Sequence, residues 1–119
     1  MIEEHRILIK FYSWKTGKFY RLVETCTWPY LEISGIRMHR ADKVDPKTDA
    51  ILKIKALGRI YSSILDCCTG LGYTVILAAK IRDVKEVITV EKDENVIFIA
   101  RQNPYSKPLF EDKNSTYNW

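Results

Sequence analysis

The hydrophobic and polar positions of this chain follow two periods, one in each half. Residues 6–12 alternate between apolar and polar side chains, residues 14–18 supply a turn with a glycine, and residues 19–28 return as a second apolar stretch. Alternation with a period of two is typical of half-buried strands. We therefore predict a β-hairpin at the start of the chain.

A further strand is predicted over residues 30–38, with Leu31, Ile33 and Ile36 facing inward. Residues 1–40 should then form a small antiparallel β unit. Its aromatic side chains could stack on nucleic-acid bases, but aromatic residues on short strands usually belong to a core, and we expect a core here. These residues are Phe11, Tyr12, Trp14, Phe19, Tyr20, Trp28 and Tyr30.

From Asp45 onward, the pattern of hydrophobic positions predicts helices that alternate with strands. Asp45 suits the N-cap of a helix and Pro46 its first position, and apolar residues recur on one face until Gly58. A strand follows that ends at Leu65, and then a helix to about Arg82. This order is typical of a parallel α/β sheet.

Residues 87–90 are apolar almost throughout, as expected of a parallel strand buried on both faces. Asp93 can cap a second helix, which Asn103 and Pro104 should end. Beyond Phe110 the chain is polar and is expected to fray.

The loop after the first parallel strand carries the most evident candidate chemistry. It contains Asp66 and then Gly70 and Gly72 directly before a helix. Glycine has no Cβ and reaches positive φ without strain, so a ligand can approach the main chain, and a helix start offers free N–H groups. A dinucleotide fingerprint would need a small residue where Val75 stands. We expect a flat, partly anionic ligand of another class.

Glu91 follows the second predicted parallel strand. Because the carboxyl ends of parallel strands share one edge of a sheet, Asp66 and Glu91 should face the same crevice. A carboxylate there can accept hydrogen bonds from both hydroxyls of a ribose. The alternative is an acid that only caps the next helix, and Asp93 is better placed for that role.

The spacing of Asp66, Gly70 and Gly72 resembles the D-x-G-x-G-x-G motif of class I S-adenosylmethionine-dependent methyltransferases, with Cys68 in place of the first glycine. The resemblance implies that Asp66 helps to hold the methionine end of the cofactor, although an acid there could also simply form the turn. The cofactor-binding residues expected on this basis are Asp66, Cys68, Thr69, Gly70, Gly72, Glu91 and Lys92.

Taken together with residues 91–93 and 103–106, the loop is similar to a family of predicted archaeal methyltransferases related in fold to spermidine synthases. The implied fold class is α/β, a partial Rossmann-like parallel sheet preceded by a small antiparallel β unit. The implied domains are a hairpin and strand unit over residues 1–40, half of an S-adenosylmethionine-binding domain over 41–110, and a polar tail over 111–119.

A complete enzyme of that class has about seven strands and binds its acceptor in the half that this sequence lacks. We therefore interpret the chain as the N-terminal, cofactor-binding part of such an enzyme, truncated and inactive alone. The methyl acceptor is unknown and could be a small molecule, RNA or protein. The alternatives are an aminopropyltransferase fragment and a non-catalytic RNA- or protein-binding module. Methyl transfer needs positioning more than a nucleophilic residue, so no catalytic residue is assigned. His39 matches a residue of the resembling family, but a lone histidine after a strand is more often structural.

The composition of the chain bears on its partners, its location and whether it binds a metal. The 119 residues carry a net charge of +4, dispersed among 15 acids, which usually means only a solvated surface. No apolar run is long enough for a membrane span, the start is no signal peptide, and three cysteines lack metal-ligand spacing. We expect a cytoplasmic protein without a bound metal. The incomplete parallel sheet predicts open strand edges, and hence a homodimer or a partner that completes the sheet.

Overall fold

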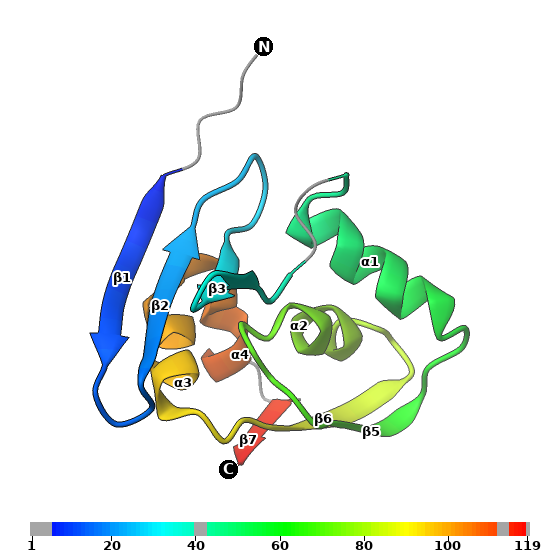
Figure 1. The fold of residues 1–119 in the computed structure, drawn as a ribbon. Coiled ribbons are helices and arrows are strands. Elements are labelled where there is room, and N and C mark those ends of the chain that lie inside the picture. The colour runs from blue at the N-terminus through cyan, green and yellow to red at the C-terminus, as the bar shows by residue number, and fades with distance from the viewer. Residues whose placement is uncertain (1–5, 40–42, 112–114, 119) are drawn as a thin grey trace. The chain divides into compact units, whose positions relative to one another are not determined.

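The computed structural model describes residues 6–39, 43–111 and 115–118 (Figure 1). Contacts divide the chain into two compact units, residues 1–49 and 50–119. Each unit is described by itself. The predicted domain limits at residues 40 and 110 stay predictions.

The first unit is an antiparallel sheet in the order β1-β2-β3-β4. Its strands are β1 (Ile7–Ser13), β2 (Lys18–Val23), β3 (Tyr30–Ile33) and β4 (Ile36–Arg37). The predicted hairpin is confirmed, because β1 and β2 pair antiparallel. Tyr20, Leu22 and Leu31 are almost fully buried and form the centre of this unit's core, and the adjacent Val23 and Tyr30 are buried as well.

Residues 30–38 form two strands and a tight turn, so the prediction of one continuous strand is wrong. Ser34 and Gly35 both have positive φ, 48° and 84°. Two successive residues of this kind reverse the chain as in a two-residue hairpin loop. Ile36, predicted to face inward, is 65% exposed.

Helix α1 (Pro46–Ala56) begins where the sequence predicts it. The Asp45 carboxylate accepts hydrogen bonds from the Thr48 N–H (2.9 Å) and hydroxyl (2.8 Å), and from the Thr27 hydroxyl (2.7 Å). Burial acts to raise the pKa of Asp45, but these hydrogen bonds outweigh it and hold the pKa below its usual value. The predicted N-cap is confirmed.

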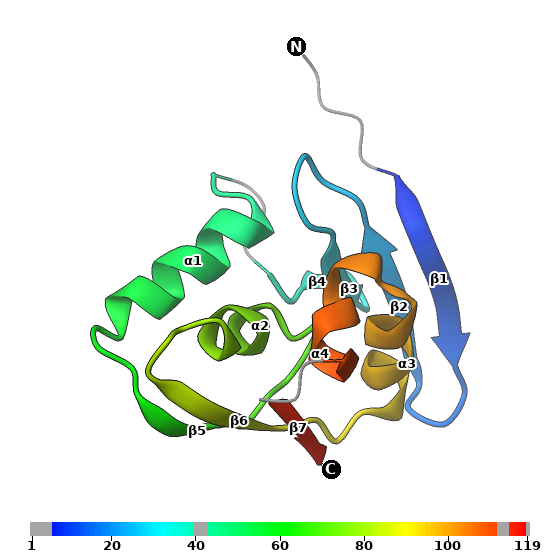
Figure 2. The same ribbon diagram turned by 180° about the vertical axis from the view of Figure 1, so that it is seen from behind.

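The second unit is a parallel sheet in the order β5-β6-β7, with β5 (Ser62–Asp66), β6 (Val84–Val90) and β7 (Ser115–Asn118). Helix α2 (Tyr73–Ala79) connects β5 to β6. The connection from β6 to β7 consists of α3 (Glu94–Gln102), the short helix η1 (Pro104–Ser106) and α4 (Lys107–Glu111). Both views show α2 and α4 over the same face of this sheet (Figures 1 and 2). Val75, Val87 and Leu109 are buried in the core between them.

The prediction that the chain frays beyond Phe110 is wrong for residues 115–118. They form β7, which pairs with residues 87–90 of β6. Pairing between main chains does not require apolar composition, so a polar stretch hid this strand. The edge of β6 that was predicted to be open is therefore covered, whereas β5 has no second neighbour among the described strands.

The predicted fold class, a partial Rossmann-like sheet preceded by a small antiparallel unit, is confirmed. Within the described residues, no helix has both the length and the apolar character needed to cross a bilayer.

Candidate functional site

The loop between β5 and α2 is fastened to the end of β6. The Thr69 N–H donates to the Val90 carbonyl (3.0 Å), and the Gly72 N–H donates to the Thr69 carbonyl (2.8 Å). Gly70 lies between these contacts with φ +56°, and no described atom lies within 4 Å of the place a Cβ would take. The space beside its Cα is therefore open to a ligand.

Glu91 follows β6 and holds this loop directly. One carboxylate oxygen accepts the Gly70 N–H (2.9 Å), and the other accepts the Asp93 N–H (3.1 Å). The Asp93 side chain accepts the Asn95 N–H (2.9 Å), which confirms Asp93 as the cap of α3. Each oxygen of Glu91 can accept a further hydrogen bond, because a carboxylate offers about four acceptor sites.

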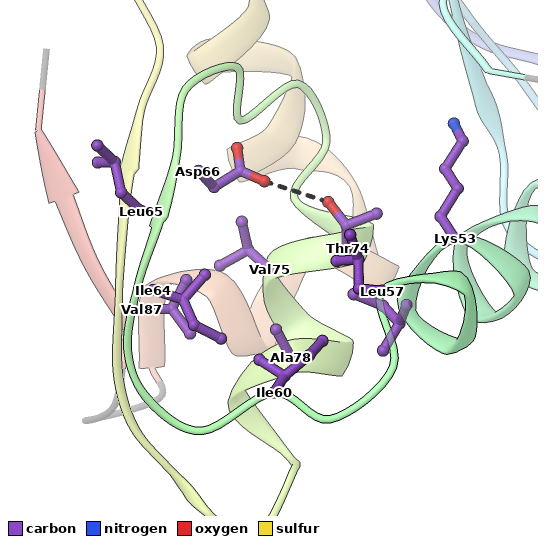
Figure 3. Close-up of a pocket in the computed structure, with 11 residues that line it drawn as sticks. Lys53, Leu57, Ile60, Ile64, Leu65, Asp66, Thr74, Val75, Ala78 and Val87 are labelled. Atoms are coloured by element: carbon purple, nitrogen blue, oxygen red, sulfur yellow. Dashed lines mark hydrogen bonds between the residues drawn. The ribbon is translucent and has the colours of Figure 1, made fainter.

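Asp66, the last residue of β5, joins three elements. One oxygen accepts the Cys68 N–H (3.2 Å) and the Thr89 hydroxyl (3.3 Å), and the other accepts the Thr74 hydroxyl (3.3 Å, Figure 3). The contact with Cys68 is the turn-forming role considered above, and it is present.

Burial raises the pKa of Asp66, and the negative charge of Glu91 adds to this effect, while the three hydrogen bonds oppose it. The two acids thus lie close enough to interact. Asp66, at the end of β5, pairs in register with Thr89, and Glu91 directly follows the end of β6, so the expectation that the two acids meet at one edge of the sheet is confirmed.

The side chains of the other residues singled out in the sequence contribute less to the site than those of Asp66 and Glu91. Thr69 is buried, and its hydroxyl lies 2.5 Å from that of Thr89, so it faces the interior. Cys68 and Lys92 are exposed. His39, in the first unit, accepts the Leu31 N–H at Nδ1 (3.2 Å), a structural contact with the main chain of β3.

Gly72 is constrained by packing. It precedes α2 with φ +81°, and a Cβ there would lie 2.7 Å from one methyl carbon of Leu109 and 2.9 Å from the other. The space above Gly72 is therefore filled by α4. The sequence motif places Gly72 with Gly70 among the cofactor-binding residues, but of the two only Gly70 has open space beside its Cα.

A buried polar cluster joins Asn103 and Ser106 to Leu71 and Tyr73, and the sequence did not predict it. The Asn103 amide donates to the Tyr73 hydroxyl (3.0 Å) and to the Ser106 hydroxyl (2.8 Å), which in turn donates to the Leu71 carbonyl (2.7 Å). Burial raises the pKa of Tyr73, although its hydrogen bond with Asn103 acts in the opposite direction. The signal in the sequence was an asparagine before Pro104, typical of a helix cap, with a serine three residues later.

A mostly apolar pocket of about 230 Å³ lies beside β5 (Figure 3). Leu57, Ile64 and Ala78 contribute to its apolar lining, and its polar lining residues are Lys53 and the hydrogen-bonded pair of Asp66 and Thr74. Leu65 lies on the other side of the strand from Asp66 and is 65% exposed. The pocket thus adjoins the strand that has no second neighbour among those described.

Comparisons with known proteins identify a related sequence and solved structures of similar fold. No family model matches the chain. It is 48% identical over 93 residues to the uncharacterized protein MJ1233 of Methanocaldococcus jannaschii, a match that covers 77% of this chain and 31% of that protein.

Solved structures share this fold, and two of them are spermidine synthases. A spermidine synthase in complex with the transition state analogue AdoDATO has a TM-score of 0.69 and 19% identity, and the match covers 94% of this chain and 40% of that one. Spermidine synthase from Thermotoga maritima matches equally well, over 95% and 40% of the two chains. The fold is that of part of a spermidine synthase. The chain spans less than half the length of each of these proteins.

Proposed function

We propose that this chain is the cofactor-binding part of an S-adenosylmethionine-dependent transferase. The observation that carries the proposal is the position of Glu91 beside Gly70. Its carboxylate keeps acceptor capacity for ribose hydroxyls, and the space beside the Cα of Gly70 is open. The fold shared with a spermidine synthase that binds AdoDATO supports a ligand of the same adenosyl class.

In this proposal the bound cofactor supplies the electrophilic carbon next to its sulfonium sulfur. The chain's own residues bind and orient it. Glu91 accepts from the ribose, and the Gly70 main chain lies against the ligand. Asp66 keeps the loop in place through the Cys68 N–H and the Thr74 hydroxyl.

Methyl transfer and aminopropyl transfer both remain candidates. The resemblance in the sequence favours the first, and the spermidine synthase fold favours the second. The two cofactors differ in one carboxylate, which decarboxylated S-adenosylmethionine lacks. We propose that a second copy or a partner strand at β5 completes the sheet.

Calorimetric titration of the chain tests the proposal. We expect S-adenosylhomocysteine and S-adenosylmethionine to bind and NAD to fail, because Val75 stands where a dinucleotide site requires a small residue. Tighter binding of decarboxylated S-adenosylmethionine would favour aminopropyl transfer. Absence of binding by every adenosyl ligand, with the fold intact by circular dichroism, would refute the proposal.

A further inference from the structure

One face of the β1–β2 hairpin carries exposed side chains that the proposed function does not use. The register pairs Lys10 with Arg21 and Tyr12 with Phe19. Successive residues of a strand point to opposite faces, so these four share one face, while the buried Tyr20 belongs to the other.

Exposed aromatic rings gather at the turn end of this face. Tyr12 is 45% and Phe19 40% exposed, and Trp14, directly after β1, is 91% exposed, so the expectation that these rings belong to a core is wrong for all three. The rings of Tyr12 and Trp14 lie edge to face with centroids 5.0 Å apart. An antiparallel sheet usually presents polar side chains to water, so a group of accessible rings offers stacking surface that the fold itself leaves unused.

Cations lie among these rings. Lys10 stands directly opposite Arg21, a pairing of like charges that destabilises a sheet. Glu32 forms an ion pair with Arg21 at 3.0 Å, which offsets one of the two charges. The hairpin, residues 7–23, contains four lysines and arginines and no acid, whereas the first unit as a whole, residues 1–49, contains nine against seven acids. The surplus favours an anionic partner, and it disfavours a second copy of the same face because the two would repel.

We propose that this face, made up of Lys10, Tyr12, Trp14, Phe19 and Arg21, binds single-stranded nucleic acid. Bases stack on the rings, and the phosphates lie near the cations. Stacking of this kind tolerates any base, so little sequence preference is expected. The inference stands independently of cofactor binding.

Fluorescence anisotropy with the full chain and a labelled mixed-sequence RNA of about 12 nucleotides tests this inference. Trp14→Ala should weaken binding by about 5- to 140-fold, the loss of one stacked base. Tyr105→Ala is the matched control, because Tyr105 is 44% exposed but lies in the other unit, and it should bind as the wild type does. Lys10→Gln should reduce the slope of log affinity against log salt by about 0.7.

Two results would overturn the inference. One is no anisotropy change for single-stranded RNA or DNA at about 50 mM salt, where phosphate contacts are strong. The other is unchanged affinity in both Trp14→Ala and Lys10→Gln, with the fold verified by circular dichroism. If Trp14→Ala instead abolishes self-association in sedimentation and leaves RNA affinity unchanged, the face pairs two copies and the nucleic-acid assignment is wrong.

Discussion

Alanine at Gly72 should destabilise the fold more than alanine at Gly70. Both residues have positive φ, 81° and 56°, so the left-handed conformation costs alanine about 1 to 2 kcal/mol at either position. Only at Gly72 does the new methyl group also overlap Leu109, whose methyl carbons would lie 2.7 and 2.9 Å away. Overpacking typically adds about 1 to 3 kcal/mol. We expect losses of about 2 to 5 kcal/mol at Gly72 and about 1 to 2 kcal/mol at Gly70.

Urea unfolding followed by far-UV circular dichroism measures both losses. A Leu109→Ala background removes the overlap and serves as the control, so the cost of Gly72→Ala should fall there to that of Gly70→Ala. Equal costs at the two glycines in the wild-type background, or an unchanged cost in the Leu109→Ala background, would refute the packing explanation.

Three further predictions concern the surroundings of the site. Asn103→Leu should lower the free energy of unfolding by about 1 to 3 kcal/mol, because the buried Tyr73 and Ser106 hydroxyls lose this partner. An unchanged midpoint of urea unfolding would contradict this prediction. The raised pKa of Asp66 means that the folded state binds its proton more tightly, so this group reduces stability as pH rises from the unfolded value of 3.8 through the folded pKa. In melting temperatures measured as a function of pH, Asp66→Asn should make this loss of stability with rising pH smaller. The same pH dependence in the wild type and the variant would show that Asp66 does not cause the loss. Leu65→Lys, beside the open edge of β5, should shift the chain toward monomer in sedimentation, whereas the control Phe98→Lys should not. A wild type that is monomeric at high concentration would contradict an interface there.

Local signals predicted much of the fold. The hairpin follows from alternation and a glycine turn, and the caps at Asp45 and Asp93 are formed by their own side chains. Asp66 and Glu91 were found because strand ends share an edge in parallel sheets.

Contacts between distant residues explain what the sequence did not predict. The packing of Leu109 on Gly72 depends on where α4 docks, and the Asn103 cluster joins residues up to 35 positions apart. β7 was missed because polar residues pair through their main chain. The turn at Ser34 and Gly35 was missed because a glycine within an apolar stretch also fits the interior of a strand.

The role of Glu91 is the central claim, and one comparison of ligands tests it most directly. Calorimetry should compare S-adenosylhomocysteine with its 2′,3′-dideoxy analogue, first on the wild type and then on Glu91→Gln, with Glu94→Gln as the control on the exposed start of α3. Because Glu91 also holds the Gly70 N–H, the substitution weakens the loop for both ligands, and only their difference reports on the ribose. We predict that the wild type and Glu94→Gln prefer the hydroxylated ligand by about 1.5 to 3 kcal/mol and that Glu91→Gln loses most of this preference. A preference that is the same in all three proteins would show that Glu91 serves the loop alone.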